Sequence, residues 1–192
     1  MKRSIALIST GGTIEKTYDE LSGVLANQIS SGPAGGGEDV SILTTRGPRS
    51  IPSVLDLMLA SLELRGIEVV RVQLMNKDSL DMSRDDHTLI AQTAGTMART
   101  MAGVVVVHGT DRLATSGDRV VELVGTPASP IVFTGAMRPW ELRSSDALQN
   151  LTEALLAVQI LAPGVYVAMH NQVLQFPGVT KDLERRTFVK AR

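Results

Sequence analysis

Residues 104–107 are four consecutive valines, and they constrain the fold of this chain more than any other segment. A run of β-branched residues without polar alternation is typical of a central strand in a parallel sheet, where helices cover both faces. Other apolar runs occur at residues 4–9, 69–74, 131–133 and 164–169. Segments of helical length separate these five runs, so each connection is too long for a hairpin.

The segments between the runs carry helix signals. Apolar residues recur at helical spacing over residues 54–62, and Gly66 is expected to end that helix. Ser83 is the predicted N-cap of the next helix, because two acidic residues follow it in the first turn. Two further helices are predicted over about residues 114–124 and residues 145–160, the second with Ser145 as its N-cap.

The alternating order predicts an α/β fold with a single doubly wound, mainly parallel sheet and helices on both faces. The length of 192 residues predicts one domain over residues 1–192. A glycine- and serine-rich stretch at residues 30–39 is expected to be a flexible loop. Ligands of such sheets bind beyond the carboxyl ends of the strands, so the residues directly after each strand are the candidates for a site.

Composition excludes several classes of function. Lys+Arg (19) and Asp+Glu (20) nearly balance, which argues against a nucleic-acid partner or an anionic membrane surface. The absence of cysteine excludes disulfides, a cysteine nucleophile and cysteine-ligated zinc. Three histidines without His-x-x-His spacing predict no metal site. No apolar run is long enough for a signal peptide or a membrane span, so a cytoplasmic protein is expected.

Two predicted strands end in small polar motifs. The first strand leads into Thr10-Gly11-Gly12-Thr13, where the glycines allow a tight turn and a hydroxyl follows directly. By itself this short motif favours a plain glycine-rich turn with a capping threonine over a reactive site. The valine run leads into His108-Gly109-Thr110-Asp111, which places a hydroxyl beside a carboxylate. Either residue of that pair is also a suitable helix cap, and His108 fits a buried, hydrogen-bonded core residue better than a general base.

Two later segments complete the set. Residues 131–133 lead into Thr134-Gly135-Ala136-Met137-Arg138-Pro139. Lys181 lies further downstream, in Val179-Thr180-Lys181. A lysine is most often a solvated surface charge, so Lys181 has chemical interest only if the chain folds it back onto Thr110 and Asp111.

Taken together, the motifs at residues 10–14, 108–111 and 135–139 resemble those of the bacterial, threonine-dependent L-asparaginase family. The resemblance runs from about residue 5 to residue 181, with each motif at a predicted strand end. It is similar to the short-chain form of the family, which lacks the C-terminal domain. The fold implied is that of the asparaginase N-terminal domain.

The resemblance implies a role for each matched residue. Thr13 matches the first nucleophilic threonine, and Tyr18 the tyrosine of a mobile lid. Ser79 matches the serine that holds the substrate α-carboxylate. The catalytic set implied is Thr13, Tyr18, Thr110, Asp111 and Lys181, in which Asp111 binds the α-amino group. The substrate-binding set implied is Gly12, Ser79, Leu80, Gly109, Thr110, Asp111 and Ala136.

These residue types suit amide hydrolysis. A threonine hydroxyl becomes a nucleophile when a neighbour accepts its proton. Tyr18 is the candidate base for Thr13, and Lys181 for Thr110, although Asp111 favours the charged form of the lysine. Backbone N–H groups near Thr110 and in the glycine turn are candidates for the oxyanion hole. Attack by threonine through an acyl-enzyme and direct displacement by water both remain open.

The chain departs from the family pattern in three ways. Leu80 stands where the family often has glutamine, and Arg112 where it often has threonine. Longer relatives also contribute a glutamate from a second domain, which positions the lid tyrosine and the substrate amino group. We expect this domain to be absent here, which predicts a more open site and altered discrimination between asparagine and glutamine.

Three other functions stay open at this point. The chain fits an ammonia-supplying subunit of an amidotransferase, and it also fits a non-catalytic amino-acid-binding domain. A nucleotide-binding module is the weakest fit, since the Gly-x-Gly-x-x-Gly spacing is absent. The leading prediction is an amidohydrolase that acts on L-asparagine, with glutamine as a minor substrate. No cofactor is implied, and self-association into a homo-oligomer is expected from the resemblance.

Overall fold

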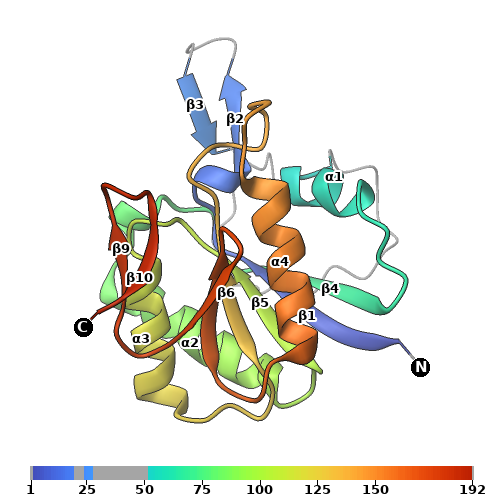
Figure 1. Cartoon of the computed structure of the whole chain (residues 1–192), viewed down its shortest axis with the longest axis vertical. Coiled ribbons are helices and arrows are strands. Elements are labelled where there is room, and N and C mark those ends of the chain that lie inside the picture. Colours follow the sequence, from blue (N-terminus) through green and yellow to red (C-terminus); the bar gives the residue numbers. More distant parts are fainter. Residues whose placement is uncertain (1, 20–23, 28–51, 192) are drawn as a thin grey trace, which may run out of the picture.

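The computed structural model describes residues 2–19, 24–27 and 52–191. Its central sheet consists of β1 (Arg3–Ser9), β4 (Ile67–Gln73), β5 (Gly103–Val107), β6 (Ile131–Thr134), β7 (Val165–Met169) and β8 (Gln172–Gln175). The strand order is β4-β1-β5-β6-β7-β8 (Figure 1). All neighbours pair in parallel except β7 and β8, which are antiparallel. The predicted mainly parallel, doubly wound sheet is therefore confirmed.

In the part of the chain that the structure describes, α-helices cover both faces of the sheet (Figure 1). They are α1 (Val54–Ala60), α2 (Arg84–Ala98), α3 (Leu113–Val124) and α4 (Ala147–Ile160). Alternate residues of each strand pack on opposite faces, because side chains along a strand point alternately up and down. In β1, Ile5 and Leu7 join the core that includes α1 and α4, whereas Ala6 and Ile8 join the core that includes α2 and α3. The four valines of β5 are fully buried between these two layers.

Two predicted helix boundaries are wrong. The first helix ends at Ala60, and Gly66 lies directly before β4 instead of ending the helix. Leu62 and Leu64 still pack at the edge of the core, but they do so from a turn, because the chain must reverse to reach Ile67. The periodicity of the apolar residues therefore continued beyond the helix itself.

The start of α4 is the second correction. Asp146, not Ser145, occupies the N-cap position, and its carboxylate bonds elsewhere. The Ser145 hydroxyl nevertheless accepts a hydrogen bond from the Ala147 N–H at 3.0 Å. The predicted start of α2 is confirmed: Ser83 is its N-cap and forms a capping box with Asp86.

Five strands have no counterpart in the predicted order. Besides β8, they form two hairpins, β2 (Lys16–Asp19) with β3 (Val24–Asn27), and β9 (Val179–Asp182) with β10 (Thr187–Lys190). Each has only four residues, which is too short for a clear alternating pattern. In Figure 1 the β2–β3 hairpin projects beyond the body of the domain, and β9–β10 lies beside α3. The loop predicted at residues 30–39 lies outside the described residues.

Candidate active site

The order of the strands places β1 between β4 and β5. The strand that follows β1 in the chain, β4, lies on one side of β1, and the later strands β5, β6 and β7 lie on the other. The carboxyl ends of β1 and β5 are therefore the topological switch point, where doubly wound sheets bind ligands. The segment after β1 carries Thr13, and the segment after β5 carries Thr110 and Asp111. Two of the sequence motifs therefore lie side by side at the carboxyl end of the sheet. We call this place, formed by the segments that follow β1, β4, β5 and β6, the crevice.

The glycines of the first motif allow the two segments to touch. Gly12 has φ of 95°, and a Cβ there would lie 2.6 Å from both the N and the Cα of Gly109. Gly11 has φ of 90°, and a Cβ there would lie 2.7 Å from the backbone N of Lys77. Thr10 fastens the turn, since its N–H and its hydroxyl both donate to the Val107 carbonyl, at 3.1 and 3.0 Å. No residue with a side chain fits at Gly11 or Gly12 without moving the backbone.

Lys181 folds back onto the second motif. Its Nζ donates to the Thr110 hydroxyl at 2.8 Å and to the Asp111 carboxylate at 2.7 Å. The Lys181 side chain is 17% exposed and that of Asp111 is 41% exposed, so the cluster lies at the rim of the crevice. Lys181 therefore does fold back onto Thr110 and Asp111, which its predicted chemical role required. About 70 residues separate it from these partners along the chain.

Ser79 approaches the same crevice from the segment after β4, in a short 3₁₀ helix (Ser79–Asp81). Its side chain is buried, and its hydroxyl has no hydrogen-bond partner among the described residues. A Cβ on Gly109 would lie 2.6 Å from that hydroxyl, so Ser79 packs directly against the second motif. A buried hydroxyl without a partner is unfavourable by roughly 1–3 kcal/mol, and such groups call for an explanation.

The other predicted site residues, Ala136, Leu80 and Tyr18, differ in how far their side chains are buried. Ala136 is buried after β6, and Leu80 beside Ser79 is 59% exposed. Tyr18 is 58% exposed on β2, and no hydrogen bond among the described residues joins its hydroxyl to Thr13. Its backbone N–H instead donates to the Glu141 carboxylate at 2.7 Å, which ties β2 to the segment after β6. The role of Tyr18 as a base stays a prediction.

Similarity to known proteins places the chain in a family. The family model described as "Asparaginase, N-terminal" matches residues 4–187. The chain belongs to the asparaginase family. It is 30% identical over 148 residues to the L-asparaginase of Thermococcus kodakarensis, with 76% of this chain and 45% of the relative covered. It is 33% identical over 167 residues to a glutamyl-tRNA(Gln) amidotransferase subunit of Haloquadratum walsbyi, with 87% of this chain and 33% of the relative covered.

The solved structures agree with this assignment. The structure of the thermostable L-asparaginase from Thermococcus kodakarensis superposes with a TM-score of 0.76 at 25% identity. The match covers 97% of this chain and 51% of that one. The asparaginase-like fold is therefore shown, and the chain spans about half or less of the length of these relatives.

His108 in this asparaginase-family chain is a core residue, as the sequence favoured. It is fully buried, and its Nδ1 donates to the Gly109 carbonyl at 2.7 Å. Because Nδ1 carries the proton, Nε2 must accept from the Ser116 hydroxyl, also at 2.7 Å. The Ser116 oxygen in turn lies 2.7 Å from Nδ1 of His87. Burial lowers the pKa of His108 to about 4, opposed by its bond to Gly109, so the ring is neutral near pH 7.

This neutral histidine makes the stability of the domain depend on pH. Between pH 6.5 and about 4 the unfolded chain binds a proton at His108 that the folded chain does not. The free energy of unfolding should therefore fall as the pH drops through this window, by on the order of 3 kcal/mol in total. Urea unfolding at about pH 7 and about pH 4.5 measures the loss, and His108→Gln should remove most of it. A wild-type stability that does not fall over this interval would contradict the expectation.

Sequence reasoning missed a buried polar group that shapes the segment after β6. The Asp146 carboxylate accepts hydrogen bonds from the N–H groups of Met137 and Arg138, both at 3.0 Å. Asn150 donates to Asp146 at 2.8 Å and to the Gly135 carbonyl at 2.9 Å. Burial raises the pKa of Asp146, but these hydrogen bonds outweigh burial and lower it, so the group stays charged. The available signal was the i,i+4 spacing of Asp146 and Asn150, which puts both on one helix face.

Glu15 was also missed, although it lies two residues after Thr13. The Ser9 hydroxyl donates to its carboxylate at 2.8 Å, and this bond joins the turn to the end of β1. Burial raises the pKa of Glu15, while the bond from Ser9 and the charge of Arg71 oppose the rise. The Glu15 carboxyl group therefore stabilises the turn that carries Thr13.

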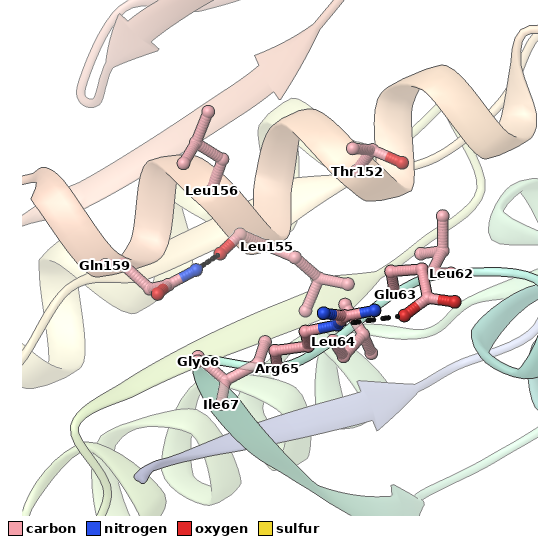
Figure 2. A pocket seen from close by; sticks show the side chains of 10 residues that line it. All are labelled: Leu62, Glu63, Leu64, Arg65, Gly66, Ile67, Thr152, Leu155, Leu156 and Gln159. Carbon is pink, nitrogen blue, oxygen red and sulfur yellow. Dashed lines mark hydrogen bonds and ion pairs between the residues drawn. The ribbon is translucent and has the colours of Figure 1, made fainter.

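A separate pocket of about 200 Å³ lies at the opposite end of the strands, where β4 begins (Figure 2). Leucine side chains from α4 and from the segment before β4 contribute to its wall, together with a Glu63–Arg65 ion pair. It has none of the threonines or the lysine of the crevice. Across residues 2–19, 24–27 and 52–191 we find no group of three side chains suited to a metal ion. No helix in this part of the chain is both long and apolar enough to cross a membrane.

Proposed function

We propose that this chain is an amidohydrolase that releases ammonia from L-asparagine, with glutamine as a minor substrate. One observation carries the proposal: Lys181 bonds to Thr110 and Asp111 on one side of a switch-point crevice, and Thr13 follows the glycine turn on the other side. Hydroxyl, carboxylate and ammonium groups at this place suit binding of an amino acid and attack on its side-chain amide.

The reaction follows from these roles. The Thr13 oxygen attacks the amide carbon, and its proton passes through Tyr18 to the leaving nitrogen, which departs as ammonia. The resulting β-aspartyl ester is cleaved by a water molecule activated near Thr110 and Lys181, which yields aspartate and restores the hydroxyl. Backbone N–H groups of the glycine turn and of the segment around Thr110 stabilise the oxyanion. Direct displacement by water is the competing route, and it predicts no enzyme adduct of acyl mass after rapid quenching.

Ser79 supplies a test of substrate binding. Its hydroxyl is buried without a partner among the described residues, and it would donate a hydrogen bond to the α-carboxylate of the substrate. Ser79→Ala should raise KM about tenfold, the loss of roughly 1.4 kcal/mol of binding, without lowering the stability of the free protein. Steady-state ammonia release and thermal unfolding measure the two effects.

Ser83→Ala is the matched control for Ser79→Ala. It removes the N-cap of α2 and should lower stability by about 1 kcal/mol while leaving KM unchanged. An unchanged KM in Ser79→Ala would remove Ser79 from the binding site.

A second function is favoured by the relative from Haloquadratum walsbyi, whose name describes part of an amidotransferase. In that case the chain supplies ammonia to a partner enzyme and is weakly active alone. Co-purification with a transferase component, together with activation by it, would support this function. A non-catalytic amino-acid-binding domain is the third possibility, and it predicts binding of aspartate or asparagine without turnover.

We further propose that the chain acts in the cytoplasm as a homo-oligomer. Leu156 and Ile160 of α4 are large apolar side chains with 59% and 73% exposure, which a second copy of the chain would cover. Light scattering should give a mass that is a multiple of that of the single chain, and cell fractionation should recover the protein with the cytoplasmic fraction. A monomer at micromolar concentration would contradict the first statement.

A further inference from the structure

Lys181 reaches Thr110 because the β9–β10 hairpin holds it there. In the hairpin Lys181 pairs with Phe188, which is buried in the core beside α3. The neighbouring strand β8 supports the same hairpin, since the Gln172 side-chain amide donates to the Thr187 hydroxyl at 2.8 Å and to the Phe188 carbonyl at 3.1 Å. The position of the lysine therefore depends on bonds made by its partner strand.

His170 connects this hairpin to the segment after β6. Its Nε2 lies 2.8 Å from the Asp146 carboxylate, and its Nδ1 lies 3.1 Å from the Thr187 hydroxyl. Asp146 also holds the N–H groups of Met137 and Arg138, directly after Ala136. One imidazole thus bridges two walls of the crevice, the segment after β6 and the hairpin that carries the lysine.

The donors and acceptors of this bridge are all matched. Asp146 stays charged and accepts only, so Nε2 of His170 is the donor. Thr187 accepts from the Gln172 amide, and its hydroxyl also lies within hydrogen-bond distance of Nδ1 of His170. Both ring nitrogens of His170 therefore have a partner, one on each side of the bridge.

His170 lies in the tight turn that joins β7 to β8. His170 and Asn171 are its two central residues, and their φ of 55° and 60° is the left-handed conformation that a two-residue hairpin turn requires. Side chains of α4 hold both in place: Asn150 accepts from the His170 N–H at 3.1 Å, and Glu153 accepts from the Asn171 N–H at 2.9 Å. The turn and these two bonds fix the place from which the His170 side chain extends.

We infer that His170 is a positioning residue. Through Thr187 it holds the Lys181 ammonium against Thr110, and through Asp146 it holds the segment after β6 in place. The inference rests on the proposed function, in which Lys181 takes part in turnover. It assigns a role to a side chain that touches neither the substrate nor Thr110.

Thr187→Val tests the bridge, because it removes the hydroxyl but keeps the branched shape. We expect kcat for ammonia release to fall at least tenfold and KM to stay within threefold of wild type. His170→Asn, which tolerates positive φ but loses both bonds, should have the same effect. Thr180→Val is the control: it lies on the same hairpin with an exposed side chain and should keep kcat within twofold.

A second arm separates positioning from general loosening of the fold. In a Lys181→Met background, Thr187→Val should lower kcat less than twofold further, because the group that it positions is already gone. A full tenfold loss in that background, or an unchanged kcat in the single variant, would overturn the inference.

The proposed function and the inference fail in different ways. If the wild-type chain releases no ammonia from asparagine or glutamine, the proposed function fails. The inference is then decided by crystal structures of Thr187→Val and Thr180→Val. In the first, the Lys181 Nζ should lie beyond hydrogen-bond distance of the Thr110 hydroxyl. Retention of that bond would overturn the inference.

Discussion

Thr13→Ala should lower kcat for ammonia release from L-asparagine by roughly 10³-fold or more, because the acyl-enzyme route loses its nucleophile. Thr13 lies directly after the glycine turn, across the crevice from Thr110 and Lys181. The substitution removes one hydroxyl from a half-buried position, so the fold should be unaffected. A coupled assay of ammonia over a range of substrate concentrations measures kcat and KM separately.

Thr13→Ser is the matched control, since it keeps the hydroxyl and should retain far more activity than Thr13→Ala. Rapid quenching of the wild-type reaction should also yield protein carrying an acyl group on Thr13. An unchanged rate in Thr13→Ala would remove Thr13 as the nucleophile. A different outcome would favour direct displacement by water: Thr13→Ala loses most of its rate, but the wild-type protein yields no adduct under conditions in which hydrolysis of an acyl-enzyme is established as slow.

Lys181→Met and Thr110→Val should each lower kcat by roughly 10³-fold, and the double variant should be little worse than either. The physical reason is the 2.8 Å bond between the Lys181 Nζ and the Thr110 hydroxyl, through which the two act as one unit. The stability should change little, since a partly exposed ion pair such as Lys181–Asp111 contributes about 0–1 kcal/mol. Losses that multiply in the double variant would show that the two residues act independently.

Lys181→Arg tests whether Lys181 contributes to turnover by transferring a proton or only by its positive charge. The guanidinium keeps the positive charge and the ion pair with Asp111, but it does not give up its proton in a protein. If Lys181 handles a proton in turnover, the arginine variant should be almost as inactive as Lys181→Met. Near wild-type activity in Lys181→Arg would assign the lysine an electrostatic role only.

The sequence predicted those parts of the fold whose signal is local. The valine run at residues 104–107 indicated a strand buried on both faces, and β5 is fully buried. Ser83 with Asp86 indicated a helix start, and both sides of that capping box form. Prediction was less accurate where a local signal fits more than one structure. The apolar spacing continued past Ala60 into a turn, so the first helix was predicted too long. Asp146 and Ser145 both suit an N-cap, and Asp146 occupies that position.

The four-residue strands could not be predicted in the same way. A strand as short as β9 or β10 is stabilised by its pairing partner and by one buried side chain in each strand, Val179 and Phe188, not by a pattern within itself. By local pattern alone Lys181 looks like any exposed lysine. The family resemblance indicated a role for it, and the hairpin places it beside Thr110. The bridge made by His170 has no local signal either, because its partners Asp146 and Thr187 are 24 and 17 residues away.

The sequence by itself determined the fold class, the strand ends at which polar residues gather, and the resemblance to the asparaginase family. These follow from local periodicity, from short motifs and from their order along the chain, all of which are one-dimensional. Only the tertiary structure decided that Lys181 meets Thr110 and Asp111, that the Ser79 hydroxyl is buried beside Gly109, and that His170 joins two walls of the crevice. Those contacts join residues far apart in the chain, so they exist only once the sheet and its helices have packed.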